Sequence, residues 1–300
     1  MSTSAHHRLS PVNWADPSRA VVVGVDGSPS NTAAVDWASR EAEATGRPLT
    51  LLAVLDDFLI PVPHHSVDPD DERAWRVLNA VSTSIRQAHP HTAVRRDVQV
   101  GGTVTVLLDR SVGQHLVVVG KRGLGSFGRM MLGSTSTGLA GRSRVPVVIV
   151  PDGWDQEAHA REPIVVGVDP MHEIDPPLRW AISRAARDGV PLQVVHGTDL
   201  AGSMVWDPRV DREATQQWTE RLSTIVRAAV GALTEEYGDV DVEVVEEGGH
   251  PADLLLRRAA AGQLLVIGRR HPGRVGFSLG SVARGVLHYA EVPVAVVPSS

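Results

Sequence analysis

The run Val21-Val22-Val23-Gly24-Val25-Asp26 returns farther along the chain as Ile164-Val165-Val166-Gly167-Val168-Asp169. Each copy is a short β-branched run that ends in an aspartate, which is typical of a strand buried on both faces and followed by a turn. Internal repeats decide how many domains and sites to expect in a chain. This one predicts two domains of the same kind.

Six further matches follow in the same order in both halves. They are Trp37-Ala38 with Trp180-Ala181, Gly46-Arg47-Pro48-Leu49 with Gly189-Val190-Pro191-Leu192, Gly101-Gly102 with Gly248-Gly249, Val117-Val118-Val119-Gly120 with Leu265-Val266-Ile267-Gly268, Gly133-Ser134 with Gly280-Ser281, and Val145-Pro146-Val147 with Val292-Pro293-Val294. Chance does not keep so many matches in order, so we interpret the chain as a duplicated domain. We expect a flexible arm at residues 1–18, a first domain at 19–151, a linker at 152–162 and a second domain at 163–300.

Short apolar runs alternate with helical patterns inside each copy. The strands expected in the first copy are Val21–Val25, Leu49–Leu55, Ala93–Val100, Leu116–Gly120 and Val147–Val150. A helix is expected after a cap at Ser30, and Trp37 is expected on its buried face. Near-continuous apolar strands separated by helices predict an α/β fold with doubly wound parallel sheets covered by helices on both faces. Such sheets bind ligands at the carboxyl ends of their strands, where the strand order reverses.

The composition narrows the classes of function. The formal net charge of −6 disfavours binding to nucleic-acid phosphates. The absence of cysteine excludes disulfides, thiolate metal sites and cysteine nucleophiles. The N-terminal residues Met1–Pro11 are polar, and the apolar runs are far shorter than the ~20 residues that span a membrane. We therefore expect a cytoplasmic protein that binds neither nucleic acid nor membrane.

A glycine-rich loop follows the expected strand Leu116–Gly120. It reads Gly120-Lys121-Arg122-Gly123-Leu124-Gly125-Ser126-Phe127-Gly128-Arg129-Met130-Met131-Leu132-Gly133-Ser134-Thr135 and leads into an expected helix. Glycines let backbone amides approach phosphate oxygens, and the helix N-terminus adds a partial positive charge. Ser134 and Thr135 can donate hydroxyls to a phosphate or bind magnesium, and Arg122 can neutralise charge. The loop predicts a polyphosphate site; the alternative is a flexible surface loop that ends in an ordinary helix cap.

The spacing Gly120-x2-Gly123-x9-Gly133-Ser134 resembles the ATP-binding signature of the universal stress protein family, and the chain is similar to that family in both halves. The resemblance implies ATP as the ligand and two tandem five-stranded sheets, each with the strand order 3-2-1-4-5. It implies contact of the nucleotide with Asp26, the main chain near Val54, Gly120, Gly123, Gly133, Ser134 and Thr135. Asp26 in Asp26-Gly27-Ser28-Pro29 is also a common type of turn residue, and both roles can hold.

The same resemblance implies contacts between domains. Two such domains in one chain are expected to pair through their last strands, Val147–Val150 and Val294–Val297, as a dimer of the family does. A homodimer of whole chains and unidentified protein partners stay open.

The second copy departs from the first in its loop. Asp169, Gly268, Gly280 and Ser281 persist, but the loop is one residue shorter, and His271 or Pro272 replaces the middle glycine. A proline there fixes φ and removes an amide donor. We expect nucleotide binding to be altered in the second half and the site to lie mainly in the first.

Two functions fit the pattern. One is a stress-response regulator that senses or stores nucleotide and modulates partners; the other is a slow ATPase or phosphotransferase. Phosphoryl transfer needs a positioned water or acceptor and a metal, and the loop offers no identifiable base, so we favour binding and assign no catalytic residue. An adenine-nucleotide module like that of electron-transfer flavoproteins is a third interpretation and would need a partner subunit. The histidines lack metal-ligand spacing and predict no metal site of their own, and the ligands of a magnesium ion bound with ATP stay open.

Overall fold

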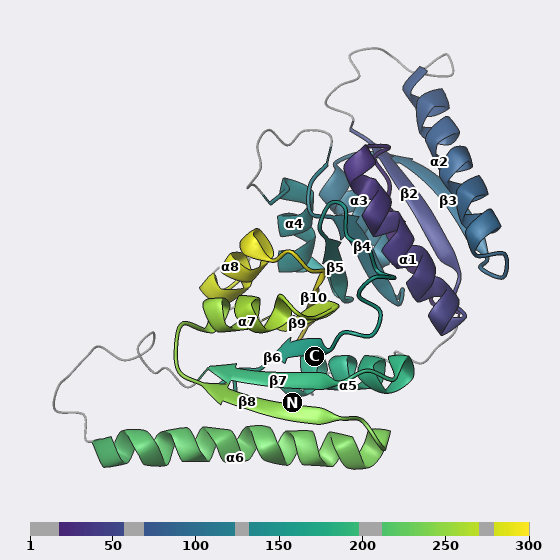
Figure 1. The fold of residues 1–300 in the computed structure, drawn as a ribbon. Coiled ribbons are helices and arrows are strands. Elements are labelled where there is room, and N and C mark those ends of the chain that lie inside the picture. The colour runs from purple at the N-terminus through teal and green to yellow at the C-terminus, as the bar shows by residue number, and fades with distance from the viewer. Residues whose placement is uncertain (1–17, 57–68, 124–131, 198–211, 270–278, 300) are drawn as a thin grey trace, which may run out of the picture.

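The computed structural model describes residues 18–56, 69–123, 132–197, 212–269 and 279–299 (Figure 1). Its strands form one ten-stranded sheet in the order β3-β2-β1-β4-β5-β10-β9-β6-β7-β8. Each half therefore has the order 3-2-1-4-5 that the sequence predicts, and neighbouring strands within a half are parallel. The two sheets expected from the sequence are two halves of one continuous sheet.

The elements follow the expected alternation in both halves. In the first half they are β1 (Val21–Gly24), α1 (Thr32–Thr45), β2 (Leu49–Leu55), α2 (Pro69–Ala88), β3 (Val94–Val100), α3 (Thr103–Ser111), β4 (Leu116–Gly120), α4 (Ser134–Arg142) and β5 (Val147–Val150). In the second half they are β6 (Ile164–Gly167), α5 (Asp175–Asp188), β7 (Leu192–Gly197), α6 (Arg212–Tyr237), β8 (Val242–Glu247), α7 (Pro251–Ala259), β9 (Leu264–Arg269), α8 (Ser281–Tyr289) and β10 (Val294–Pro298).

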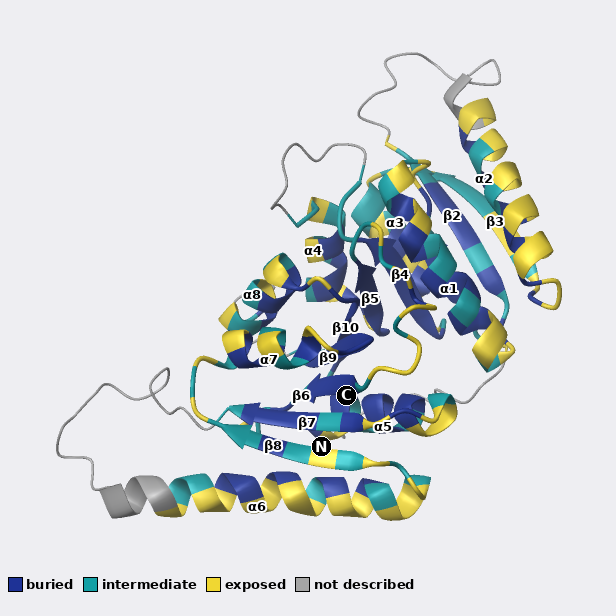
Figure 2. Cartoon of the chain, in the orientation of Figure 1, coloured by how far each residue is buried: buried dark blue, intermediate teal, exposed yellow. Residues whose placement is uncertain are grey.

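Helices cover both faces of the sheet. One buried cluster joins α1, α2, α5 and α6 to the sheet, and a second joins α3, α4, α7 and α8 to the opposite face. Figure 2 shows the central strands as buried and the outer faces of the helices as exposed. Trp37 and Trp180, at equivalent positions of α1 and α5, both lie in the first cluster, as the sequence predicts.

Glycine determines where two of these helices end. Gly46 after α1 and Gly189 after α5 have φ values of 63° and 64°, in the left-handed region that closes a helix. The prediction that Ser30 caps α1 is wrong. Pro29 begins a short 3-10 turn, and α1 starts only at Thr32, after Asn31.

The two halves meet edge to edge. Strands β5 and β10, the last strands of their halves, pair antiparallel, with Val148 opposite Ala295, Val147 opposite Val296 and Ile149 opposite Val294. The sequence repeat makes Val148 and Ala295 equivalent residues, so this pair lies on a local pseudo-two-fold axis. Among the described residues no helix is both long and apolar enough to span a membrane.

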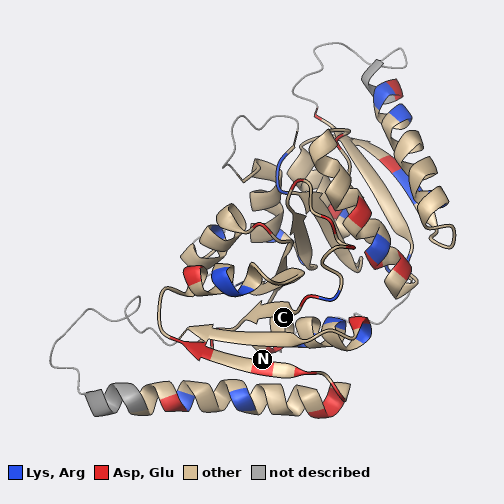
Figure 3. Cartoon of the chain, viewed as in Figure 1, with Lys and Arg blue, Asp and Glu red and all other residues tan. Residues whose placement is uncertain are grey.

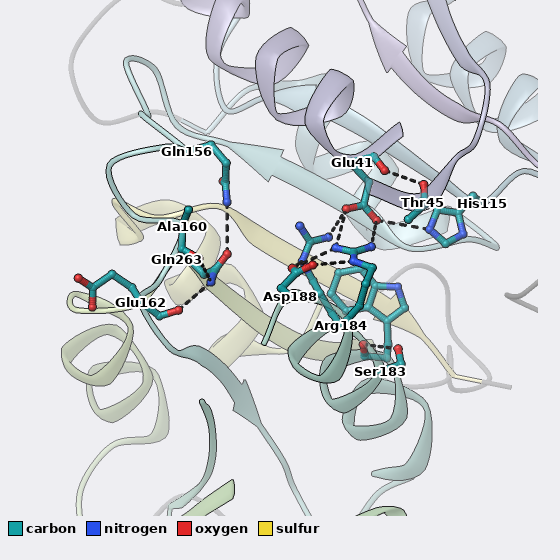
Figure 4. A network of polar contacts seen from close by, with 12 residues as sticks. Glu41, Thr45, His115, Gln156, Ala160, Glu162, Ser183, Arg184, Asp188 and Gln263 are labelled. Carbon is teal, nitrogen blue, oxygen red and sulfur yellow. Dashed lines mark hydrogen bonds and ion pairs between the residues drawn. The ribbon is translucent and has the colours of Figure 1, made fainter. Parts of the chain in front are cut away.

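A buried ion pair joins α1 to α5 beside this axis (Figure 4). Glu41, 2% exposed, accepts hydrogen bonds from Arg184 Nη1 at 2.6 Å and from Arg187 Nη1 at 3.1 Å. Burial opposes ionisation of Glu41, but the charges of Arg184 and Arg187 outweigh it and hold the pKa of this carboxyl well below its usual value.

We expect Glu41→Gln to lower the free energy of unfolding at pH 7 by about 3–5 kcal/mol, because it leaves buried guanidinium charge without its partner. The folded-state pKa of Glu41 lies below the unfolded-state value, so its stabilisation is complete above about pH 4.3 and declines as the pH falls towards the folded-state pKa. The wild-type free energy of unfolding should therefore fall more steeply than that of the variant from about pH 5 to about pH 3. Chemical denaturation across this range measures both slopes.

Glu157→Gln is the matched control. Glu157 pairs with Arg40 at 3.0 Å but its side chain is 79% exposed, so its loss should change the free energy of unfolding by less than about 1 kcal/mol. Equal pH slopes for wild type and Glu41→Gln would contradict the lowered pKa of Glu41 in the folded protein.

Candidate functional site

The first candidate site lies at the carboxyl ends of β1 and β4, where the strand order reverses. Asp26 follows β1, and the glycine loop follows β4. The two segments touch, since a Cβ built on Gly123 would lie 2.9 Å from Asp26 Oδ2. A larger residue at position 123 would require the exposed Asp26 side chain to shift.

Asp26 has the turn role that the sequence allowed. Its Oδ1 accepts hydrogen bonds from the Ser28 amide at 2.9 Å and the Ser28 hydroxyl at 2.7 Å. Its side chain is exposed, with Oδ2 on the side of Gly123. The contact with a nucleotide that the resemblance implies stays a prediction.

The base of the glycine loop is closed. The Gly133 amide donates to the Lys121 carbonyl at 3.0 Å, so the residues before and after the loop lie together. A Cβ on Gly120 would lie 3.0 Å from the Arg122 carbonyl, and one on Gly133 would lie 3.3 Å from the Lys121 carbonyl. Residues 124–131, the middle of the loop, are outside the described residues.

Helix α4 starts directly at this base. Gly133 is its N-cap and gives no side-chain capping bond, while Ser134 is exposed and Thr135 half-buried in the first turn. A helix start without a side-chain cap presents its amide groups and partial positive charge to a ligand. The predicted residues Gly120, Gly123, Gly133, Ser134 and Thr135 are thus brought to one place.

Two buried polar residues that the sequence did not single out support this site. Ser136 donates its hydroxyl to the Gly120 carbonyl at 2.8 Å, and Asn31 donates from Nδ2 to the Gly24 carbonyl at 3.0 Å. They fix the ends of β4 and β1, from which the two site loops depart. Comparison of the two repeats could have identified both residues, because their equivalents in the second half are the apolar Ala283 and Ile174.

The cations before the loop point towards the joint between the halves. Lys121 Nζ donates to the Ala290 carbonyl after α8 at 2.8 Å, and Arg122 pairs with Asp152 at 2.7 Å. Burial and the charge of Arg122 lower the pKa of Lys121. Phosphate contact by Arg122 stays a prediction. Val54 lies within β2, opposite Gln99 of β3, rather than after the strand.

The second half has a cavity of about 1010 Å³ at the carboxyl ends of β6, β7 and β9. The four residues predicted there, Asp169, Gly268, Gly280 and Ser281, all line it. The cavity also has apolar lining from Ile174 and Ala283, which replace the polar Asn31 and Ser136 of the first half. The sequence had predicted an altered site, and His271 and Pro272, which motivated that prediction, lie outside the described residues.

Two polar side chains of this cavity lack hydrogen-bond partners within the described part of the chain. They are His196 at Nε2 and Arg269 at Nε, and burial lowers the pKa of Arg269. Asp169 accepts from the Met171 amide at 3.1 Å, and its Oδ2 lies 2.9 Å from His172 Nδ1. Across the described ranges, no group of three or more His, Cys, Asp or Glu residues is placed to hold a metal ion.

These features define a tandem doubly wound α/β protein with a candidate ligand site at the strand switch point of each half. The model of the Universal stress protein family matches residues 17–151 and 160–298, and the chain belongs to this family.

Relatives and a solved structure agree with that assignment. A universal stress protein of Mycolicibacterium smegmatis is 33% identical over 293 residues, covering 92% of this chain and 96% of the relative. Universal stress protein Rv2005c of Mycobacterium tuberculosis is 34% identical over 299 residues, covering 93% and 97%. The crystal structure of a universal stress protein from Archaeoglobus fulgidus DSM 4304 has a TM-score of 0.75 at 22% identity and covers 94% of this chain and 99% of its own, which shows the same fold.

We expect Ser136→Ala to lower the free energy of unfolding by about 1 kcal/mol, because it removes a buried hydrogen bond to the Gly120 carbonyl. Thr137→Ala is the control, since the Thr137 hydroxyl makes an exposed bond within its own helix turn, to the Gly133 carbonyl. The control should stay within about 0.5 kcal/mol of wild type in chemical denaturation. Equal losses in the free energy of unfolding for the two variants would contradict a stabilising role for the hydrogen bond from Ser136 to Gly120.

Proposed function

We propose that the protein is an ATP-binding stress-response regulator whose nucleotide site lies mainly in the first half. The observation that carries the proposal is the contact of Gly123 with Asp26 beside the start of α4. Asp26, for which the family resemblance implies nucleotide contact, lies beside the glycine loop and near the start of α4, and this supports a single site.

The geometry of the loop suits a polyphosphate. The hydrogen bond from the Gly133 amide to the Lys121 carbonyl holds the ends of the loop together, and the first turn of α4 offers amide groups together with the Ser134 and Thr135 hydroxyls. Phosphate at a helix N-terminus gains both hydrogen bonds and a favourable dipole. The two hydroxyls are also the groups that would hold a magnesium ion accompanying ATP.

The polar supports explain why we assign the site mainly to the first half. Asn31 and Ser136 anchor the strand ends there through hydrogen bonds, whereas Ile174 and Ala283 at the equivalent positions cannot. The cavity of the second half keeps Gly280 and Ser281 at the start of α8. We expect weaker or different binding there, because Ile174 and Ala283 contribute apolar side chains to the lining.

A regulatory role fits the charges near the loop better than catalysis. Asp26 accepts hydrogen bonds from Ser28, and Asp152 pairs with Arg122, so both carboxylates near the loop already have structural contacts. A ligand that binds only the folded state stabilises it by mass action, so nucleotide occupancy can be read by a protein partner without chemistry. Slow ATP hydrolysis at the same site is the alternative.

We expect Gly123→Ala to weaken ATP binding at least about tenfold, because the new Cβ displaces Asp26 Oδ2 and narrows the approach to the loop amides. Isothermal titration calorimetry measures the affinity. Gly141→Ala is the matched control, since a Cβ on this α4 glycine has its nearest contact at 4.0 Å, with Leu279 Cγ. An unchanged affinity in Gly123→Ala would refute the first-half site.

The two halves can be compared through one pair of equivalent serines. Ser134→Ala should reduce the ATP or ADP released per purified chain on denaturation, whereas Ser281→Ala should leave the amount near the wild-type value of roughly one. A larger loss in Ser281→Ala would transfer the main site to the second half. If wild type releases none and also fails to bind added ATP, the proposed function is wrong.

A further inference from the structure

The joint between the halves has a centre at which a residue meets its own repeat equivalent. In the sheet this is the pair Val148 and Ala295. The pseudo-two-fold axis through that pair preserves the faces of the sheet, so α1 and α5 come together on one face (Figure 1). Residues of α1 and α5 near the axis therefore face their equivalents.

Glu41 and Arg184 are such equivalents. The repeat aligns Trp37 with Trp180, and Glu41 and Arg184 each lie four residues farther along their helices. The structure places their side chains in contact, with Arg184 Nη1 donating to Glu41 Oε2 at 2.6 Å. The Arg184 guanidinium also lies over the rings of both tryptophans, 4.7 Å from the Trp37 centroid and 5.8 Å from that of Trp180.

The pair is buried and surrounded by charged neighbours. The side chains of Glu41 and Arg184 are 2% and 8% exposed. Figure 3 shows other charged residues along the helices, the loops and the edge strands. Arg187 donates to Glu41 from both terminal nitrogens, and His115 Nε2 lies 3.5 Å from Glu41 Oε1. Asp188 pairs with Arg184 at 3.4 Å and with Arg187 at 2.6 Å.

The remaining contacts of the joint are also unlike in the two halves. His115 precedes β4 and reaches Glu41, whereas its equivalent Gln263, before β9, donates to the linker carbonyls of Ala160 and Glu162 at 3.2 and 2.7 Å (Figure 4). One position thus serves the ion-pair cluster in the first half and anchors the connecting segment in the second.

Association of two identical halves would replace the attraction between Glu41 and Arg184 with repulsion between like charges. Two first halves joined through β5 would place Glu41 against a second Glu41, and two second halves joined through β10 would place Arg184 against a second Arg184. Like charges confined in a buried site repel strongly and cannot shed their desolvation penalty. Only a first half against a second half brings the opposite charges together.

We propose that the Glu41–Arg184 pair, with Arg187, is a pairing-specificity element that makes the joint accept only unlike halves. It selects first half against second half and excludes association of whole chains through like halves. The inference rests on the interface alone and holds whether or not the chain binds nucleotide. Self-association of the full chain must then use a surface other than the β5 and β10 edges.

A charge swap in the full chain tests the proposal. Glu41→Arg and Arg184→Glu should each lower the Tm by about 5 °C or more, and the double variant should recover most of the loss. Arg179→Glu is the control on the same helix, because the Arg179–Glu236 pair is exposed and its loss should shift the Tm by less than about 2 °C. Additive losses in the double variant would overturn the proposal.

Mixing the two single variants tests whether the charges at positions 41 and 184 decide which halves pair. In an equimolar mixture, one chain carries arginine and the other carries glutamate at both positions. Every joint between the two kinds of chain, through like or unlike halves, therefore brings opposite charges together, whereas the joint within either variant brings like charges together. Native mass spectrometry should show dimers containing one chain of each variant, with no such dimers in either variant alone. Equal dimer formation by one variant alone would overturn the proposal.

If the reversed charges prevent folding, Glu41→Gln, Arg184→Gln and their combination give the same test of coupling. The double variant should lose less Tm than the sum of the two single losses, because neither charge is then left alone in the joint. A Tm loss in the double variant equal to the sum of the two single losses would again overturn the proposal.

Discussion

The pairing of β5 with β10 is the interaction on which the rest of the structure depends. Both strands are buried along their whole length, and both are the last strands of their halves. A separate half would leave such an apolar strand as an open edge, which invites uncontrolled pairing with other chains. Joining the two edges within one chain removes both, and leaves the more polar β3 and β8 as the ends of the sheet.

Features within each half could be predicted from the sequence, whereas side-chain contacts across the joint could not. The strands, their order and the meeting of Val147–Val150 with Val294–Val297 depend on local patterns, on the repeat and on a family resemblance, so they were available from the sequence. The contact of Glu41 with Arg184 was not, because it links residues far apart in the chain and needs the position of the pseudo-two-fold axis. The same holds for Lys121, whose Nζ donates to the Ala290 carbonyl across the joint.

The candidate site divides in the same way. Glycine spacing located the loop, and the structure adds the close approach of Gly123 to Asp26. The supports Asn31 and Ser136 were missed because each is an ordinary polar residue near a helix start, where capping is the usual interpretation. Their side chains instead bond to strand-end carbonyls, and comparison with Ile174 and Ala283 is what separates the two halves chemically.

The glycine loop and the joint between the halves share Lys121 and Arg122. Lys121 and Arg122 lie at the base of the glycine loop, yet Lys121 bonds to the end of α8 and Arg122 to Asp152 in the connecting segment. A ligand that draws either cation towards the loop must weaken these contacts, and a change in the joint must alter the cations that the ligand meets. Binding equilibria linked in this way are reciprocal, so a coupling free energy measured from one side has to equal that measured from the other. The halves differ at this position too, because Arg269, the counterpart of Lys121, lines the second cavity and its Nε has no hydrogen-bond partner among the described residues.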